Sequence, residues 1–250
     1  MRDIPIMFTP DMAAGARNGA KTQTRRPMRP QPYDDYGRLA WMFKAKNCGS
    51  WGPEGGAPDP AWLARCPYGV GDQLWVRETF VAFGRWETRF SVKKGRDEWH
   101  FVDMTLDTGR QYRYSGDLPN AKRDSVTPTW WRRPAIFMPR AASRTQLEVV
   151  SNRIERVQQI READAAAEGV EPPETDRDNH DWAICPQCGG TRLYNAIGPN
   201  LGVMPDTDCF ECDTHIKRFR HLWDSINTER GLGWDANPWV WVVEFRRMEG

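Results

Sequence analysis

The clearest pattern of apolar and polar positions lies beyond residue 215. From residue 216 to residue 226 the apolar side chains recur at helical spacing, with basic residues on the other faces. This pattern predicts a helix that packs on a core. Residues 238–245 are rich in tryptophan and valine, too aromatic and β-branched for a surface helix, and they predict a buried strand.

Three segments in the first two thirds of the chain also have patterns that predict secondary structure. Residues 72–81 follow a Gly-x-Gly turn and are rich in β-forming, largely apolar residues, which predicts a central strand. Residues 144–150 predict another strand. The alanine-rich segment 161–168 predicts a short helix that ends at Gly169, because glycine adopts the left-handed conformation that commonly follows a helix.

A helix is also expected close to the N-terminus. Thr9 can cap it, Pro10 suits its first position, and Asp11 favours the positive end of the helix dipole. Asn18 and Gly19 tolerate left-handed geometry and should end it. The polar segment that follows, residues 21–26, therefore emerges directly from the end of a helix.

The remaining chain has weaker periodicity. We expect loop-rich insertions at about 29–67 and 84–135, with strands at 89–92 and 111–114 inside the second, and an acidic linker at 171–181. Short helices around dispersed strands indicate an α+β fold with a small mixed barrel. The 250 residues are best interpreted as one domain, 1–250, that carries insertions.

Composition narrows the class of protein. The formal charge is only +1, so a polyanionic partner would have to be held by local patches rather than by a global field. No segment has the roughly 20 apolar residues that a membrane span needs, and residues 1–10 lack the layout of a signal peptide. We expect a cytoplasmic protein.

Four of the six cysteines form two Cys-x-x-Cys pairs about 20 residues apart. Such pairs bring four thiolates onto one ion and leave no open position for a catalytic water. The sequence therefore predicts a structural Zn²⁺ in a zinc-ribbon insertion at about 182–214, with a redox pair as the lesser alternative. His215 is a possible substitute ligand, and Cys48 and Cys66 are expected to be free thiols. The predicted metal ligands are Cys185, Cys188, Cys209 and Cys212.

Two motifs and the last strand carry a resemblance to a known family. Residues 19–26 (GAKTQTRR), residues 71–78 (GDQLWVRE) and the terminal WVWVVEF run together resemble the signature of ASCH domains, members of the PUA-like superfamily. Further runs around residues 132–140 and 223–227 resemble an uncharacterised branch common in phages and prophages. The resemblance implies a PUA-like mixed β pseudo-barrel with flanking short helices and a small zinc-ribbon insertion.

The resemblance also implies an activity. Small bacterial ASCH members hydrolyse the acetyl amide of acetylcytidine with a lysine, a threonine and a glutamate, and the matching positions are Lys21, Thr24 and Glu78. A lysine held neutral can activate a threonine hydroxyl, and a carboxylate can pass the proton to the leaving amine. In an extended segment Lys21 and Thr24 point to opposite sides, and a turn would be needed to bring them together. A purely structural Lys–Glu pair is the simpler alternative.

These observations predict an amidohydrolase that acts on an acylated or modified nucleobase, in a nucleoside or in RNA. A non-catalytic reader of RNA or modified DNA is the alternative, and a ribonuclease is the third interpretation. Candidate substrate-binding or nucleic-acid-binding residues are Arg25, Arg26, Trp75 and Arg77. The aromatic and basic residues 130–133 are typical of single-strand binding. A structural role, in which they fill the space within a loop, is an equally good interpretation.

Overall fold

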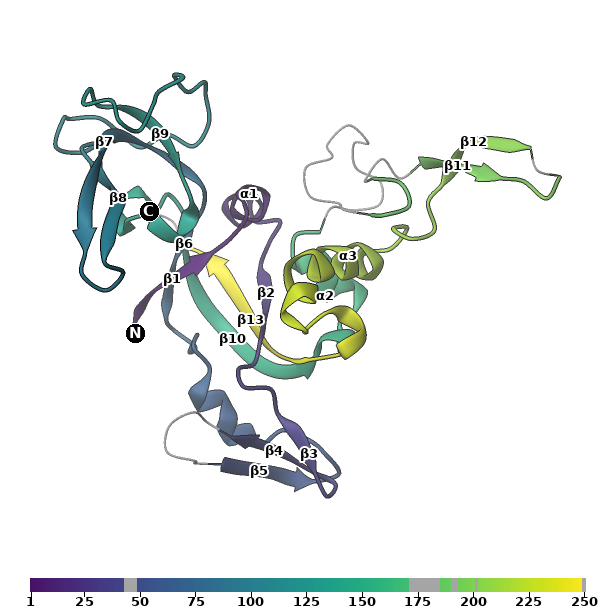
Figure 1. Ribbon diagram of the computed structural model, residues 1–250. Helices are drawn as coiled ribbons and strands as arrows, with labels where there is room; N and C mark the ends of the chain where they lie inside the picture. The colour runs from purple at the N-terminus through teal and green to yellow at the C-terminus, as the bar shows by residue number, and fades with distance from the viewer. Residues whose placement is uncertain (43–48, 171–184, 190–192, 201, 249–250) are drawn as a thin grey trace. The chain divides into compact units, whose positions relative to one another are not determined.

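The computed structural model describes residues 1–42, 49–170, 185–189, 193–200 and 202–248. It has a mixed α/β structure with mostly strands, a few short helices and several small sheets (Figure 1). The chain divides into two compact units. The first unit comprises residues 1–4, 14–74 and 146–250, and the second unit comprises residues 5–13 and 75–145. The acidic linker expected at 171–181 lies outside the described residues.

The largest sheet has five strands. Their order is β1 (Asp3–Met7), β6 (Gln73–Arg77), β10 (Gln146–Arg156), β13 (Trp239–Arg247) and β2 (Gln23–Pro27). Strand β13 pairs antiparallel with both β10 and β2, and its first five residues are buried. The strands predicted at 144–150 and 238–245 are therefore confirmed, because a strand that is apolar on both faces belongs inside a sheet.

The helices begin and end close to the expected residues. Helix α1 spans Pro10–Asn18, and the Thr9 hydroxyl accepts a hydrogen bond from the Met12 amide. Helix α2 spans Glu162–Ala167 and is followed by Gly169 at a φ of 79°. Helix α3 spans His215–Asn227 and buries its apolar face. All three were predicted from capping residues and periodicity.

Residues 29–67 differ from the loop that the sequence suggested. They hold a three-stranded sheet of β3 (Tyr33–Asp35), β4 (Arg38–Met42) and β5 (Gly49–Glu54), followed by the 3-10 helix Pro60–Arg65. The Trp41 ring lies 5.4 Å from Trp62 and 5.5 Å from Trp241 between centroids. Large rings thus form a small core without the periodic pattern from which strands are predicted. Cys66 is a buried free thiol there, whereas Cys48 lies outside the described residues.

The second unit contains a sheet of its own. Strands β7 (Phe80–Ser91), β8 (Arg96–Asp103) and β9 (Thr129–Arg133) pair in the order β8-β7-β9. The single strand predicted at 72–81 is divided into β6 and β7 at Glu78 and Thr79. Of the strands expected in this region, 89–92 largely belongs to the end of β7, while 111–114 makes only an isolated bridge from Arg113 to Val81.

The remaining described elements are short: β11 (Leu193–Ile197), β12 (Val203–Asp208) and the 3-10 helices Ala135–Phe137, Arg140–Ala142, Val157–Gln159, Thr228–Arg230 and Trp234–Ala236. Strands β11 and β12 form a hairpin between the two cysteine pairs. Within the described part of the chain, no helix combines the length and the apolar character that crossing a membrane would require.

Candidate functional site

The four cysteines predicted from the two Cys-x-x-Cys pairs lie together. Their sulfur atoms all fall within 4.8 Å of one another, and all four residues are buried. The Sγ atoms of Cys185 and Cys209 are 3.7 Å apart, and those of Cys188 and Cys212 are 3.5 Å apart. Four sulfurs at roughly 2.3 Å from a tetrahedral Zn²⁺ stand about 3.8 Å from one another. The cluster therefore fits a single metal ion of this size.

Helix α3 anchors the second cysteine pair. The Arg218 guanidinium is buried and donates to the carbonyl of Cys212 over 2.8 Å, and the imidazole of His221 contacts the carbonyl of Glu211 at 2.8 Å. His215 instead contacts the Glu162 carboxylate through Nδ1 at 3.2 Å. The described residues thus assemble a four-cysteine centre at the beginning of α3, and His215 is occupied by another partner.

Strand β2 sends consecutive side chains to opposite faces of the sheet. Its register with β13 sets Gln23 opposite Glu244 and Arg25 opposite Val242 on one face, while Arg26 stands opposite Trp241 on the other. Two neighbouring arginines of the conspicuous basic motif therefore face different surroundings.

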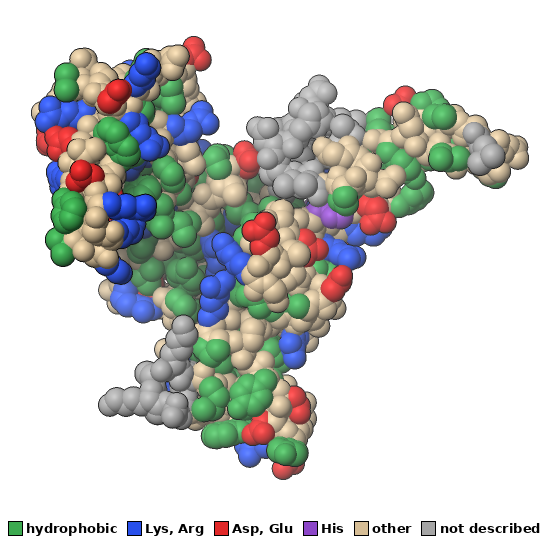
Figure 2. All heavy atoms as spheres, viewed as in Figure 1, with side chains coloured by type: hydrophobic (Ala, Val, Ile, Leu, Met, Phe, Trp, Pro, Cys, Tyr) green, Lys and Arg blue, Asp and Glu red, His purple; other side chains and the backbone are tan. Residues whose placement is uncertain are grey.

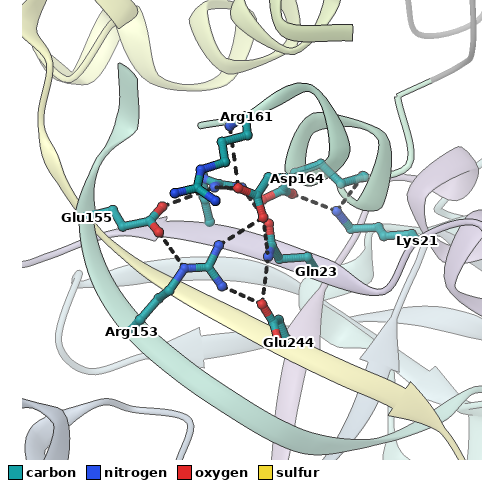
Figure 3. Close-up of polar contacts among 9 residues, drawn as sticks. Lys21, Gln23, Arg153, Glu155, Arg161, Asp164 and Glu244 are labelled. Atoms are coloured by element: carbon teal, nitrogen blue, oxygen red, sulfur yellow. Dashed lines mark hydrogen bonds and ion pairs between the residues drawn. The ribbon is translucent and has the colours of Figure 1, made fainter. Parts of the chain in front are cut away.

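On the Gln23 and Arg25 face lies an ion-pair network, drawn in Figure 3. Lys21 donates from Nζ to the carboxylate of Glu168 over 2.9 Å and to its carbonyl over 2.7 Å. The Arg25 guanidinium reaches the other oxygen of the same carboxylate at 3.2 Å. One glutamate at the end of α2 thus joins the two basic residues of the motif.

The network continues across the sheet. Arg25 also pairs with Glu155 at 3.2 Å and with Asp164 at 3.6 Å. Asp164 is in turn bound by Arg153 at 2.9 Å, and Arg153 further pairs with Glu155 and Glu244 (Figure 3). The Gln23 amide donates to both Asp164 and Glu244. Three cations therefore meet four carboxylates, which leaves the cluster close to neutral. The network comprises Lys21, Gln23, Arg25, Arg153, Glu155, Asp164, Glu168 and Glu244.

Lys21 is the most enclosed cation of this network. Its side chain is 1% exposed, and burial lowers its pKa even though the Glu168 carboxylate opposes the change. Gly169 makes the enclosure possible, because a Cβ built on this residue, at a φ of 79°, would lie 2.9 Å from the Cβ of Lys21. Gly169, which follows α2, therefore leaves the space that the Lys21 side chain occupies.

The predicted catalytic residues are distributed over different surroundings. Thr24 is buried and stands opposite Val243 in the register, on the face that Arg26 shares, whereas Gln23 and Arg25 belong to the network face. Glu78 lies in the second unit, where Arg144 binds both of its carboxylate oxygens at 2.8 and 2.9 Å. The Arg144 guanidinium is stacked over the Tyr114 ring at 3.7 Å. The described contacts thus join Lys21 to Arg25 through Glu168, and they join Glu78 to Arg144.

Trp75 and Arg77, predicted to bind a base, contact each other. The Arg77 guanidinium lies 4.5 Å from the Trp75 ring centroid, and the Arg140 guanidinium lies 6.0 Å from it. Trp75 is buried and Arg77 is half-buried. In this arrangement the indole packs in the interior with a cation on its face.

The face of the sheet that carries Arg26 is hollowed. A cavity of about 520 Å³ is lined by four arginines that come from separate segments of the first unit. They are Arg26 of β2, Arg29 after it, Arg65 at the end of the 3-10 helix Pro60–Arg65, and Arg230 at the end of the 3-10 helix Thr228–Arg230. Of the described residues that line the cavity, none is an aspartate or a glutamate. We call this site the arginine pocket.

Three aromatic residues complete the arginine pocket: Trp41, Tyr68 and Trp241. Trp41 and Trp241 are almost fully buried and pack edge to face, so they form a rigid wall. The carbonyl of Tyr68 accepts a hydrogen bond from the Asn152 amide of β10 at 2.9 Å. Tyr68 is half-buried, which leaves part of its surface available to a ligand.

Sequence reasoning identified Arg26 but missed the other lining residues of the arginine pocket. Arg29, Trp41, Arg65 and Tyr68 lie in the segment that had no periodicity, and Arg230 follows α3 by three residues. No spacing rule connects these positions, since only the tertiary fold brings them to β13 and β2.

No protein-family model, curated protein or solved structure matches this chain.

Proposed function

We propose that this protein binds nucleic acid and takes one nucleotide unit into the arginine pocket. The observation that carries the proposal is that four arginines and three aromatic residues line one cavity, which has no carboxylate among its described lining residues. Guanidinium forks match phosphate oxygens in geometry and charge, and the half-buried Tyr68 offers aromatic surface to a flat base. The cavity of about 520 Å³ lies within the usual range for small-ligand sites.

Charge balance supports a phosphate-bearing ligand. The arginine pocket gathers four arginines at a hollow surface, and none of its described lining residues is a carboxylate. Like charges that converge in this way repel one another, and a bound anion would relieve that repulsion. An acidic peptide would neutralise the arginines, but it would contact the aromatic residues less well than a nucleotide base does.

The test is binding of a fluorescein-labelled strand of ten nucleotides, as RNA and as DNA, measured by fluorescence anisotropy at two salt concentrations. Arg26→Ala and Arg230→Ala should each weaken binding about tenfold, because each removes a charge-assisted hydrogen bond. Arg246→Ala is the matched control, since that exposed arginine of β13 pairs with Glu148 outside the pocket. Equal losses in all three variants would refute a role for the arginine pocket.

A second candidate is hydrolysis of an acylated cytidine by Lys21, Thr24 and Glu78. The lowered pKa of the buried Lys21 amine favours it, because a general base must be able to lose its proton near neutral pH. In the network the amine donates to Glu168, so Lys21 would have to exchange this partner in order to activate a hydroxyl. Thr24, the proposed nucleophile, would have to be reached across the strand.

Hydrolysis is tested with acetylcytidine, both free and within RNA, by following cytidine release by chromatography. The second candidate predicts release that is lost in Lys21→Ala and in Glu78→Gln while the variants remain folded by circular dichroism. Absence of release from both substrates would leave the binding function alone, and cleavage of unmodified RNA would indicate a ribonuclease.

We also propose that the fold is PUA-like, of the ASCH type. The support is that the motif 19–26 leads from α1 into β2, and that β2 pairs directly with β13, the terminal strand rich in tryptophan and valine.

We further propose that the four-cysteine cluster is a structural zinc site, because four buried thiolates complete a tetrahedron around one ion.

A further inference from the structure

The second unit concentrates positive charge. Residues 5–13 and 75–145 contain 14 Lys and Arg against 9 Asp and Glu, a net charge of +5, which leaves 21 against 25 in the rest of the chain. The near-neutral total of +1 conceals this segregation. In Figure 2 the part that contains β7, β8 and β9 shows blue side chains next to green ones. Such a composition favours a polyanionic partner.

Four side chains of this unit form a stacked array, which we call the Arg–aromatic platform. Phe83 of β7 and Trp130 of β9 are register partners, and their rings stand 5.4 Å apart. The Arg110 guanidinium lies 4.0 Å from the Phe83 ring centroid, and the Arg113 guanidinium lies 3.9 Å from that of Trp130. Each ring is therefore covered by a cation. Both arginines are exposed and both rings are half-buried.

A cavity of about 560 Å³ opens at the platform. It is lined by Arg110, Gln111, Tyr112, Arg113 and Trp130, and no carboxylate side chain occurs among these described residues. The carboxylate of Asp103 accepts hydrogen bonds from the Tyr112 hydroxyl and from the Thr105 amide. Burial, together with Asp103, raises the pKa of Tyr112. The phenol is thus a neutral group, and the cavity is cationic overall.

Strand alternation extends the basic surface. Arg132 follows Trp130 by two residues on β9, so both side chains belong to the same face of the strand, and Arg132 is exposed. Stacking holds a guanidinium in plane and leaves its N–H groups at the edge, which lowers the entropy lost when they bind phosphate. Its outer face can still stack on a base.

We propose that the Arg–aromatic platform of the second unit binds single-stranded nucleic acid, with phosphates at Arg110, Arg113 and Arg132 and unpaired bases stacked on the guanidinium and indole planes. A duplex hides its base faces, so a surface whose main feature is stacked planes suits a single strand. The platform is a site separate from the arginine pocket, and neither proposal depends on the other.

The experiment uses the full chain and a labelled twelve-nucleotide oligothymidylate or oligouridylate, followed by anisotropy over a range of salt concentrations. Arg110→Ala combined with Arg113→Ala should weaken binding at least tenfold and reduce the salt slope by about two. Arg89→Ala with Arg96→Ala is the matched control, since these exposed arginines of the same unit pair with Glu87 and Glu98. A loss no greater than that of the control pair would overturn the proposal.

Two further measurements separate stacking from charge alone. Arg113→Lys keeps the charge and loses the planar group, so it should keep most of the salt slope and still weaken binding severalfold. Unlabelled single strand should displace the probe much better than a duplex or inorganic polyphosphate of equal phosphate concentration. Equal displacement by all three competitors would overturn the assignment to a single strand. Arg26→Ala distinguishes the two sites, because it changes the arginine pocket and leaves the platform intact.

Discussion

Arg25 and Arg26 are consecutive residues of one strand, and they illustrate the difference between the two faces of the sheet. Arg25 has a side chain that is 0% exposed and is surrounded by Glu155, Asp164 and Glu168. Arg26 is half-buried and opens into a cavity with three further arginines. A buried cation that is neutralised by its own chain holds structure together, whereas several cations that line one open cavity favour an external anion.

The sequence of a basic motif does not show which of its residues are structural and which can bind a ligand. Residues 21–26 read as one cationic patch, but strand alternation divides it into a structural half and a candidate binding half. The partners of the structural half come from β10, α2 and β13, more than 120 residues away. The role of each basic residue therefore depends on which of these distant residues the fold places next to it.

The largest effect is expected from removal of the zinc ion that we propose for the four-cysteine cluster, and it should loosen helix α3 and the ion-pair network. Four buried thiols gathered without an ion would have to be protonated, and structural zinc sites contribute on the order of 10 kcal/mol to folding. The cluster precedes α3, whose Phe219 ring lies 5.8 Å from the Arg25 guanidinium. Purified protein should contain one zinc per chain, and chelation should unfold α3 and loosen the network, as measured by circular dichroism and hydrogen exchange.

The metal centre has a direct control. Cys66→Ser alters a buried free thiol outside the cluster and should leave the zinc content unchanged, while Cys209→Ser should reduce it. A chain that contains no metal and keeps full protection of α3 would contradict the structural role of the cluster.

Substitution of the two arginines should separate stability from binding. Arg25→Met should lower the free energy of unfolding by about 3 kcal/mol, because it leaves buried carboxylates with fewer cations. Arg26→Met should lower it by about 1 kcal/mol or less, since this side chain is only half-buried and lines an open cavity. Urea unfolding followed by tryptophan fluorescence measures both. Equal destabilisation would remove the distinction between the two faces.

The smallest effect is expected on the pH dependence of stability. Hydrogen bonding from Ser151 and the charge of Arg153 lower the pKa of Glu244, and contacts with Gln23, Arg25 and Arg153 outweigh burial to lower that of Asp164. A carboxylate with a depressed pKa in the folded state contributes stability that is present above the unfolded value, about 4.5 for Glu, and is lost as the pH falls through the folded value.

Glu244→Gln should therefore destabilise the protein at pH 7 by less than Arg25→Met does, and the difference from the wild type should shrink as the pH falls below about 4.5. Glu148→Gln is the matched change on the neighbouring strand β10, where the carboxylate pairs with the exposed Arg246. A Glu244 effect that stays constant between pH 7 and pH 3 would show that charge has no part in it.

Local signals predicted the elements well wherever capping and periodicity agree. Thr9 and Pro10 mark the beginning of α1, Gly169 follows the end of α2, and the apolar spacing of 216–226 locates α3. The strands β3–β5 were missed because Trp41 and Trp62 make a core by aromatic stacking, without alternation. The break at Glu78 was missed because β-propensity continues across it.

The candidate sites were predictable only where the chemistry is local. The two Cys-x-x-Cys pairs carry their own spacing and were recognised directly. Glu168 is the partner of Lys21 and Arg25 but lies 147 residues from the former, and the arginine pocket draws on five separate segments. Sequence periodicity reports which face a residue occupies, and it does not report what the fold brings to that face.

The most direct test of the account is to locate bound nucleic acid on the first unit by photo-crosslinking. A strand that carries 4-thiouridine is irradiated on the full chain, and the crosslinked peptides are identified by mass spectrometry. Crosslinks are expected at Trp41, Tyr68 or Trp241, and they should disappear in Arg26→Ala and persist in Arg246→Ala. Crosslinks absent from these three residues, or unchanged in Arg26→Ala, would contradict the claim that the arginine pocket binds a nucleotide.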